Sequence, residues 1–421
     1  MRMSGAANQV PTFFLTAAEH SGDALGASLI GALRRRFPEA RFVGVGGPRM
    51  EAAGCRLLAN PVSRSAMLIG ALFTESRYWF GLLKRIRQEL VDLKPDVVVP
   101  IDSSTVNLRI ARLGRELKIP VCYYVAPQVW ASRPWRVKKI AASVDALCCV
   151  LPFEEGYFRE RGVHAVYVGH PMFDAAAQTA ENDPERLEPA LPTGEPKVAI
   201  FPGSRRAEIG HHMPPMLAIL SEIKGRFPRA TFVAAAPSEE RAWQIRHLLR
   251  QANTPVDIRV GNGDAIIRWA DLVLTKSGTA TLQIARQHKP MVVMYAVAWW
   301  KWHFFARFLI TTPYLALVNI LARRELVPEF IPFYGSPLPV ARECIDLLAK
   351  PERRAQMAAE LAELTAPLAP APGSGDLGLA AERVAAEVAR LVEGRSAAAG
   401  VAEAAAPEPA PSEIPPPPAA C

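Results

Sequence analysis

The sequence lacks the features that mark several special classes of protein. No stretch of its 421 residues is apolar without interruption over about 20 positions, so no membrane-spanning helix is predicted. The first residues carry no apolar core typical of a signal peptide, and we therefore expect a cytosolic protein. The chain contains no internal repeat of fixed period and no nucleic-acid-binding motif, so we expect neither a repeat architecture nor a nucleic-acid partner.

Cysteine is scarce, and its spacing offers no metal-binding or redox motif. None of the six cysteines forms a C-x-x-C pair, and Cys148 and Cys149 are adjacent within an apolar run. A chain of this size does not need a disulfide framework, so we expect buried or inert thiols. No metal ligand and no cofactor is predicted.

The rest of the composition is that of a globular protein with an excess of basic residues. Half of the residues are hydrophobic, 21% are charged, and the formal net charge is +8. The length suggests about two or three domains. The basic balance favours acidic lipid headgroups or anionic substrates as binding partners.

Apolar runs alternate with segments of helical spacing, which predicts an α/β fold. Strands are predicted at 13–17 and 41–45 with a helix between them, and such units build parallel sheets. The pattern restarts with a strand at 197–201, which predicts two Rossmann-like domains facing a cleft, with ligands beyond the carboxyl ends of the strands. Further strands are predicted at 97–101, 121–125, 146–150, 231–235, 257–260, 272–274 and 291–295, and helices near 76–93, 108–117, 213–223 and 379–391.

The composition also divides the chain. The Ala- and Pro-rich end cannot bury enough apolar surface to offset the entropy of ordering, so it is predicted to be disordered. The predicted parts are a flexible start (1–11), a first domain (12–175), a linker (176–196), a second domain (197–350), C-terminal helices (351–394) and the tail (395–421).

Polar residues gather where four of the predicted strands end, at 19–23, Asp102, 203–206 and 277–283. The last group follows a buried strand and opens a helix, so it combines free backbone N–H groups, small residues and hydroxyls, as phosphate-binding turns do. Arg205 follows a Pro-Gly-Ser turn, where a guanidinium suits a diphosphate. The carboxylates among these residues could instead cap helices, and the sequence leaves that alternative open.

These groups resemble, in order and over about residues 12–345, the motifs of the lipid-A-disaccharide synthase family. The similar stretches are 18–23, 42–50, 94–96, 101–102, 124–131, 151–154, 168–171, 201–205, 277–282 and 319–329. The resemblance implies an inverting, metal-independent GT-B glycosyltransferase that joins UDP-2,3-diacylglucosamine to 2,3-diacylglucosamine 1-phosphate (lipid X). The implied product is the β-1,6-linked lipid A disaccharide, made at the cytoplasmic face of the inner membrane.

The resemblance also implies roles for individual residues. Asp102 is the expected general base, and its position at a predicted strand end suits that role. The expected substrate-binding residues are Glu19, Ser21, Gly22, Asp23, Gly203, Ser204, Arg205, Ser277, Gly278, Thr279, Thr281, Gln283, Asn319, Arg324 and Glu325.

The chain departs from the family pattern at several of these motifs. Gln283 stands where the family usually has Glu, so an expected ribose contact changes from a charged acceptor to an amide. Thr105 replaces a second carboxylate, and Arg323 replaces a glycine. Ala18 and Ser132 are further departures, from Gly and Trp.

Two aromatic stretches, at 65–80 and 299–310, are candidates for contact with a membrane surface. Both interleave apolar and aromatic residues with a few cations, a composition that suits the headgroup boundary of a bilayer. The alternative is that both are ordinary buried helices. The residues predicted to face the membrane are Met67, Leu68, Ile69, Trp299, Trp300 and Trp302.

Two other functions fit the same residues. One is a non-catalytic protein that binds a nucleotide sugar or a lipid, which Gln283 and Thr105 favour. The other is a UDP-sugar epimerase of the same fold, which would not need the aromatic stretches. The sequence leaves the oligomeric state open, with a homodimer as one option.

Overall fold

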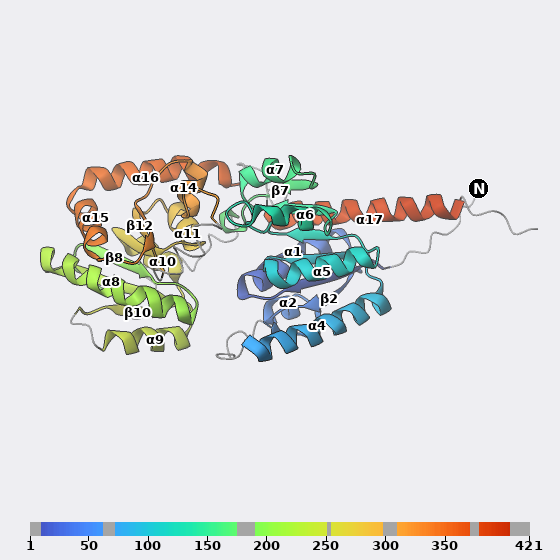
Figure 1. The fold of residues 1–421 in the computed structure, drawn as a ribbon, viewed down its shortest axis with the longest axis horizontal. Coiled ribbons are helices and arrows are strands. Elements are labelled where there is room, and N and C mark those ends of the chain that lie inside the picture. Colours follow the sequence, from blue (N-terminus) through green and yellow to red (C-terminus); the bar gives the residue numbers. More distant parts are fainter. Residues whose placement is uncertain are drawn as a thin grey trace, which may run out of the picture. The chain divides into compact units, whose positions relative to one another are not determined.

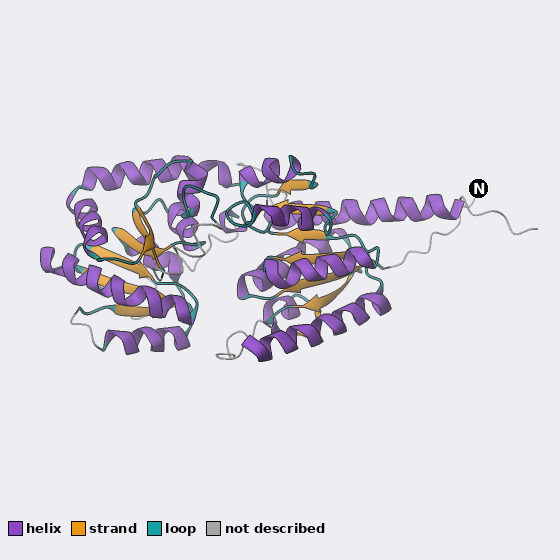
Figure 2. Ribbon diagram, viewed as in Figure 1, coloured by secondary structure: helices purple, strands orange, loops and turns teal. Residues whose placement is uncertain are grey.

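A computed structural model describes residues 10–61, 72–174, 190–250, 254–297, 310–370 and 379–404. It contains two sheets of parallel strands with helices packed around them, which confirms the predicted α/β class (Figure 1 and Figure 2). Contacts divide the chain into two units that are not continuous in sequence. The first comprises residues 1–125, 141–148 and 381–421, and the second comprises 126–140 and 149–380.

The first sheet has the strand order β3-β2-β1-β4-β5-β6-β7. Its central strands are long apolar runs because both faces are covered, and residues 13–15 of β1 are fully buried. The order reverses between β1 and β4, where Ala17 pairs with Ile101, so the segments that follow these two strands start side by side. The strands are β1 (Thr12–Ala17), β2 (Arg41–Val45), β3 (Arg56–Ala59), β4 (Val97–Ile101), β5 (Cys122–Tyr124), β6 (Ala146–Cys149) and β7 (Ala165–Tyr167).

Amphipathic helices cover this sheet. In α4 (Leu72–Leu93) the apolar residues Leu82, Ile86 and Leu90 recur every fourth position and are buried. The last described helix, α17 (Ala380–Ala404), belongs to the same unit from residue 381. Its buried Glu382 pairs with Arg35 and Arg36 of α1 (His20–Arg36). The other helices up to the second sheet are α1 (His20–Arg36), α2 (Pro48–Ala52), α5 (Ser104–Glu116), α6 (Val137–Ala141) and α7 (Pro152–Arg159), with short 3-10 turns at Pro134–Arg136 and Pro171–Phe173.

The second sheet has the order β10-β9-β8-β11-β12-β13 and reverses between β8 and β11. Phe201 of β8 pairs with Thr275 of β11, so the residues after both strands again start side by side. The strands are β8 (Lys197–Phe201), β9 (Thr231–Ala236), β10 (Asp257–Val260), β11 (Leu272–Lys276), β12 (Met291–Ala296) and β13 (Glu329–Phe333). The helices are α8 (Arg206–Arg226), α9 (Glu239–Leu249), α10 (Gly263–Trp269), α11 (Ala280–Arg286), α14 (Leu317–Ala322), α15 (Leu338–Ala349) and α16 (Pro351–Thr365), followed by a 3-10 turn at Ala366–Leu368.

The end of the chain differs from the prediction. Helix α17 continues to Ala404, so the expected disorder is wrong for residues 395–404. Alanine is the strongest helix former, and this part of the chain is rich in alanine but contains no proline. Arg395 also anchors the helix, because its Nη1 donates to the carbonyl oxygens of Pro95 at 2.7 Å and Asp96 at 3.3 Å. Residues 405–421 lie outside the described ranges.

Two further expectations concern burial and membranes. The five described cysteines are all buried, as predicted, and none of these five forms a disulfide bond. Burial raises the pKa of the Cys55 thiol to about 12, which makes it unreactive at neutral pH. Within the described residues, no helix is long and apolar enough to cross a membrane.

Candidate active site at the strand ends

Asp102, the predicted base, follows β4 in a backbone conformation that L-residues rarely adopt. Its φ is +56° and that of Ser103 is +40°. Left-handed conformations of this kind cost about 1–3 kcal/mol each and persist only where the surroundings enforce them. Here the Asp102 N–H donates to the Tyr124 carbonyl at 2.9 Å, and the Tyr123 hydroxyl donates to the Asp102 carbonyl at 2.7 Å.

Asn107 is the second support of this turn, and the sequence did not single it out. The side chain is buried on α5, and its Nδ2 donates to the carbonyl oxygens of Ile101 at 2.7 Å and Asp102 at 3.0 Å. Its Oδ1 accepts a hydrogen bond from Thr16 Oγ1 at 3.0 Å. One amide therefore ties the end of β1 to the end of β4 and fixes the backbone that carries Asp102.

The Asp102 carboxylate is oriented by two hydrogen-bond donors. Its Oδ1 accepts from the Ser103 N–H at 2.7 Å, and its Oδ2 accepts from Ser21 Oγ at 3.3 Å. Ser21 lies in the first turn of α1, so the structure brings two predicted site residues together across 81 positions of sequence. A half-buried carboxylate held in this way keeps lone pairs available for a proton, as a general base must.

Asp23 does not cap its own helix, which is one of the two roles that the sequence suggests for it. It is buried, and its carboxylate accepts from the backbone N–H groups of Gly47 at 2.8 Å, Arg49 at 3.0 Å and Met50 at 3.0 Å. It therefore caps α2 rather than its own helix. Gly22 lies against the sheet, where a Cβ would come within 3.2 Å of the Ala17 Cβ, and Glu19 is the exposed N-cap residue of α1 without a side-chain cap bond.

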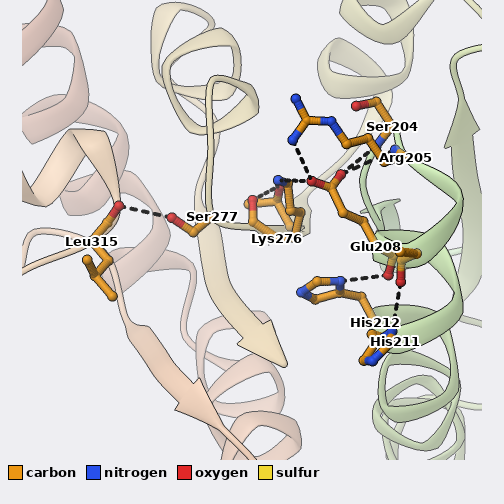
Figure 3. A network of polar contacts seen from close by, with 10 residues as sticks. Ser204, Arg205, Glu208, His211, His212, Lys276, Ser277 and Leu315 are labelled. Carbon is orange, nitrogen blue, oxygen red and sulfur yellow. Dashed lines mark hydrogen bonds and ion pairs between the residues drawn. The ribbon is translucent and has the colours of Figure 1, made fainter. Parts of the chain in front are cut away.

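In the second unit, the turn after β8 closes around Glu208 (Figure 3). Glu208 Oε2 accepts from the N–H groups of Ser204 at 3.1 Å and Arg205 at 3.3 Å, and Lys276 Nζ donates to Oε1 at 2.9 Å. Gly203 is required here, because its φ is +119° and a Cβ would lie 2.6 Å from Glu208 Oε2. The Arg205 side chain is 69% exposed, and its Nη1 lies 3.9 Å from Glu208 Oε1.

The charge of Glu208 is set by competing effects. Burial acts to raise the pKa of this carboxyl, but the hydrogen bond and charge of Lys276, together with the two backbone N–H groups, outweigh it and lower the pKa. Glu208 is therefore an anion at neutral pH. Neither Glu208 nor Lys276 was among the predicted binding residues, although Lys276 opens the Ser-Gly-Thr stretch and Glu208 stands at the third position of its helix, where a capping box places Glu or Gln.

Two hydroxyls of the stretch 277–281, those of Ser277 and Thr281, donate to backbone carbonyls. Ser277 Oγ donates to the Leu315 carbonyl at 2.9 Å (Figure 3), and Thr281 Oγ1 donates to the Gly278 carbonyl at 2.8 Å. Gly278 has a φ of +148°, and Thr279 is the N-cap residue of α11. The N–H groups of Thr281 and Leu282 also donate to backbone, to the Gly278 and Thr279 carbonyls at 3.0 and 3.1 Å. What the turn can offer a ligand is therefore the N–H groups at 278–280, ahead of these bonds.

Gln283 points to a neighbouring helix. Its Nε2 donates to Asp264 Oδ1 on α10 at 2.9 Å, and Gln287 Nε2 donates to the same oxygen at 2.9 Å. Arg286 completes the cluster with an ion pair to Asp264 Oδ2 at 2.5 Å. The amide that replaces the family's usual Glu thus joins α10 to α11.

Asn319 and Glu329 build the loop that faces Ser277. Buried Asn319 accepts from the N–H groups of Leu326 at 2.9 Å and Val327 at 3.0 Å, and donates to Glu329 Oε2 at 3.0 Å. Glu329 also accepts from the N–H of Leu315 at 2.7 Å, the residue whose carbonyl Ser277 holds. Two other predicted residues are engaged at the surface: Arg324 pairs with Glu360 at 2.7 Å, and Glu325 Oε1 accepts from the Glu329 N–H at 3.3 Å.

A second buried carboxylate, Glu154, holds the loop that contains Trp130. Trp130 Nε1 donates to Glu154 Oε1 at 2.9 Å, and the N–H groups of Val150 and Leu151 donate to Oε2 at 3.2 and 3.1 Å. Burial raises the pKa of Glu154 to about 7 despite these three donors. Thr311 Oγ1 donates to the Trp130 carbonyl at 2.6 Å. The loop is therefore also held by a residue that lies far beyond Glu154 in sequence.

The remaining predicted positions lie outside the described residues, namely Met67, Leu68, Ile69, Trp299, Trp300 and Trp302. Among the residues that the structure does describe, no group of three or more His, Cys, Asp or Glu side chains could hold a metal ion.

The chain is similar to known proteins over most of its length. The family model described as lipid-A-disaccharide synthetase matches residues 13–367. A lipid-A-disaccharide synthase from Anaeromyxobacter dehalogenans (strain 2CP-C) is 35% identical over 357 residues, which cover 84% of this chain and 92% of the relative.

Solved structures with the same fold are much less similar in sequence. A complex of S. aureus MnaA with UDP has a TM-score of 0.60 at 12% identity, covering 89% of this chain and 94% of that one. CalG4, the calicheamicin glycosyltransferase, has a TM-score of 0.55 at 15% identity, covering 93% of this chain and 100% of that one. These likenesses show the fold, and the family match is what distinguishes the chain from other proteins that share it. The chain belongs to the lipid-A-disaccharide synthase family of glycosyltransferases and has the GT-B fold.

Proposed function

We propose that this chain transfers the acylated glucosamine of UDP-2,3-diacylglucosamine to 2,3-diacylglucosamine 1-phosphate, giving lipid A disaccharide 1-phosphate and UDP. The observation that carries the proposal is the family match over residues 13–367, with Asp102 present at the end of β4. The acceptor hydroxyl oxygen forms a bond to the anomeric carbon from the face opposite UDP. The bond from that carbon to the diphosphate oxygen breaks, and the configuration is inverted.

Asp102 takes the proton of the acceptor hydroxyl as the new bond forms. Its position supports this role, because Asn107, Tyr123 and the Tyr124 carbonyl fix the backbone while Ser21 and the Ser103 N–H orient the carboxylate. A positioned base of this kind contributes about 10²–10⁴ to a rate. Backbone strain concentrated at one carboxylate favours a functional role for it over a simple helix cap.

The departing UDP carries negative charge that the second unit can stabilise. The N–H groups of Gly203 to Arg205, those at 278–280 ahead of α11 and the Arg205 guanidinium offer donors and a cation for the diphosphate. Gln283 and Asn319 stand in the same unit, where they support the turns around the nucleotide. Thr279, Arg324 and Glu325 are at its surface and remain candidates for contacts with the sugar.

Both substrates carry acyl chains, so we further propose that the chain works at the surface of the inner membrane. The aromatic stretches around Met67 and Trp299 would supply the contact. Replacing Trp299, Trp300 and Trp302 by Ser should weaken binding to vesicles of anionic phospholipid and leave UDP binding intact. Unfolding of this variant would instead indicate a buried helix.

Release of UDP with and without lipid X tests the enzymatic proposal. Release that depends on the acceptor, together with a disaccharide product, supports glycosyl transfer. Conversion of the donor sugar without acceptor would support an epimerase, and a bound donor that never turns over would support a binding protein. Either result would contradict the proposal.

A further inference from the structure

In the second unit, several hydrogen-bond donors converge on a side chain of the protein itself, the Glu208 carboxylate. Glu208 accepts from the N–H groups of Ser204 and Arg205 and from Lys276 Nζ, and the Arg205 guanidinium lies 3.9 Å away (Figure 3). These donors come from the ends of β8 and β11, the two strands at which the sheet reverses. Donors converging on one carboxylate at a switch point form an anion site that is already filled from within.

A second observation shows that this polar cluster is incomplete. His212 is buried one turn further along α8, and its Nδ1 bonds to the Glu208 carbonyl at 2.7 Å. Burial lowers the pKa of the ring, so His212 is neutral at pH 7, with Nδ1 donating and Nε2 left as an acceptor. That Nε2 has no hydrogen-bond partner among the described residues. The centroid of the Tyr295 ring lies 5.0 Å from that of the His212 ring and 5.7 Å from Lys276 Nζ, so the three side chains lie beside one another.

We propose that Lys276 is a further diphosphate-binding residue and that Glu208 holds the place of the diphosphate in the nucleotide-free protein. The inference rests on the proposed use of UDP. When UDP binds, Lys276 and the Ser204 and Arg205 N–H groups turn from Glu208 to the phosphate oxygens. Because Glu208 repels the diphosphate and competes for the same donors, it limits the affinity for UDP and favours release of UDP after transfer.

Charge gives the direction of each effect. Two cations and one anion leave the cluster with a single net positive charge, against a ligand that carries at least two negative charges. Removing the Glu208 charge should tighten UDP binding, and removing the Lys276 charge should weaken it. The structural alternative is that Glu208 only completes the capping box of α8 and that Lys276 only neutralises Glu208.

The experiment uses Glu208→Gln, Lys276→Met and the double variant of the full chain. Glutamine keeps an oxygen for the Ser204 and Arg205 N–H groups and is accepted in a capping box, so it removes charge with little change in shape. Calorimetry would give Kd for UDP, UMP and uridine. The matched control is Lys224→Met, which removes a lysine from the last turn of the same helix, where Nζ donates to the Ala230 carbonyl at 2.8 Å.

We expect Glu208→Gln to lower the Kd of UDP about tenfold and Lys276→Met to raise it about tenfold, since one charge-assisted hydrogen bond is worth about that much. UMP should respond less, and uridine not at all, because it has no phosphate. The double variant should bind UDP about tenfold more weakly than Glu208→Gln alone. Lys224→Met should match the unmodified chain.

The double variant decides between the two explanations even if Lys276→Met alone folds poorly, because it contains no unpaired carboxylate. Equal UDP affinity of the double variant and Glu208→Gln would overturn the inference and leave Lys276 as a counter-ion only. Equal losses for UDP and uridine would overturn it too, since they would indicate general damage to the site. If the unmodified chain binds no UDP, the proposed function fails along with the inference, which is a different result from either of these.

Discussion

Glu154 and Glu208 are two carboxylates in the same local geometry with opposite electrostatics. Each stands at the third position of a helix that follows a parallel strand, and each accepts two consecutive backbone N–H groups on its Oε2. The third partner differs: neutral Trp130 Nε1 for Glu154, and the Lys276 ammonium for Glu208. Burial without a cation raises the pKa of Glu154 to about 7, whereas the cation keeps that of Glu208 below its usual range although burial opposes it.

The third donor makes Glu154 a structural helix cap and makes the surroundings of Glu208 suitable for an anion. Glu154 is fully buried and holds the Trp130 loop in place, and none of its three described hydrogen-bond donors is a cation. At Glu208 the same arrangement includes a lysine and has an arginine beside it, so its donors suit a phosphate equally well. One capping motif therefore serves two purposes, and the residue that distinguishes them comes from a strand 68 positions away.

The largest effect is expected at a third carboxylate, Asp102, which neither caps a helix in this manner nor pairs with a cation in the described contacts. Asp102→Asn should cut turnover by about 10²–10⁴ and leave UDP affinity and melting temperature nearly unchanged. Asparagine tolerates the left-handed backbone at this position, so the turn should survive the change. Steady-state kinetics with lipid X would measure the loss.

Asp96→Asn is the matched control, because Asp96 precedes the same strand and its carboxylate accepts from the Thr12 N–H at 2.8 Å. It should leave turnover nearly normal. Near-normal turnover in Asp102→Asn would show that Asp102 is only a structural residue. Glu19 or His20 would then be the candidate base. A larger loss of turnover at Glu154 than at Asp102 would break the comparison altogether.

The next effect is a pH dependence of stability at Glu154. Its folded-state pKa of about 7 exceeds the ordinary value of 4.5, so the folded protein binds the proton more tightly than the unfolded chain. The contribution to stability is present below about pH 4.5 and is lost as pH rises through about 7, by about 3 kcal/mol in total. Denaturant unfolding across this range should show the slope in the unmodified chain and lack it in Glu154→Gln.

The quantity to compare is the slope of the unfolding free energy against pH. Its absolute value is not used, because glutamine also turns an amide N–H toward Trp130 and lowers stability at every pH. Glu208→Gln is the control of opposite sign. Since the folded-state pKa of Glu208 is lowered, its contribution is present above about pH 4.5 and is lost as pH falls through the folded-state pKa. Equal pH profiles of Glu154→Gln and the unmodified chain would show that Glu154 ionises normally.

A smaller effect is expected at Arg205. Arg205→Ala should raise the Kd of UDP about tenfold and slow the reaction, because in the proposed reaction the guanidinium faces the diphosphate before and during transfer. The side chain is 69% exposed, and solvent screening keeps the effect modest. Arg206→Ala changes the next residue and should alter UDP binding much less. Equal effects at both positions would indicate a diffuse basic surface without a specific diphosphate contact.

Most strands predicted from the sequence are continuous apolar runs. The bounds of β2, β4 and β8 match the prediction because their buried positions require such runs. The bounds of β10 match as well, although it is a half-buried edge strand that contains Asp257 and Arg259. Edge strands β3 and β13 are only half-buried, and β13 contains Pro332, so neither shows the pattern. Strand β7 has three residues, too few for any periodicity.

Residues of the candidate site also differ in whether local sequence alone reveals them. Asp102 and the glycines at 203 and 278 could be found because a strand end and a turn are local features. Other residues act through partners that are distant in sequence and close only in the fold, and no sequence spacing predicts such contacts. They are Asn107, Lys276 and Glu329. Asp23 shows the limit most clearly, because a carboxylate at the start of one helix caps a different helix 24 positions later.

The smallest effect is expected at Glu360, which pairs with a cation as Glu208 does but at the surface. Arg324 Nη2 lies 2.7 Å from Glu360 Oε2, and its hydrogen bond lowers the pKa of that carboxyl. Glu360→Gln should change the free energy of unfolding by about 0.5 kcal/mol or less, because exposed ion pairs gain little in water. Denaturant unfolding at low and at high salt would measure it, and salt should remove the remaining difference. A loss well above 1 kcal/mol would mean that this ion pair stabilises the fold strongly although it is not buried.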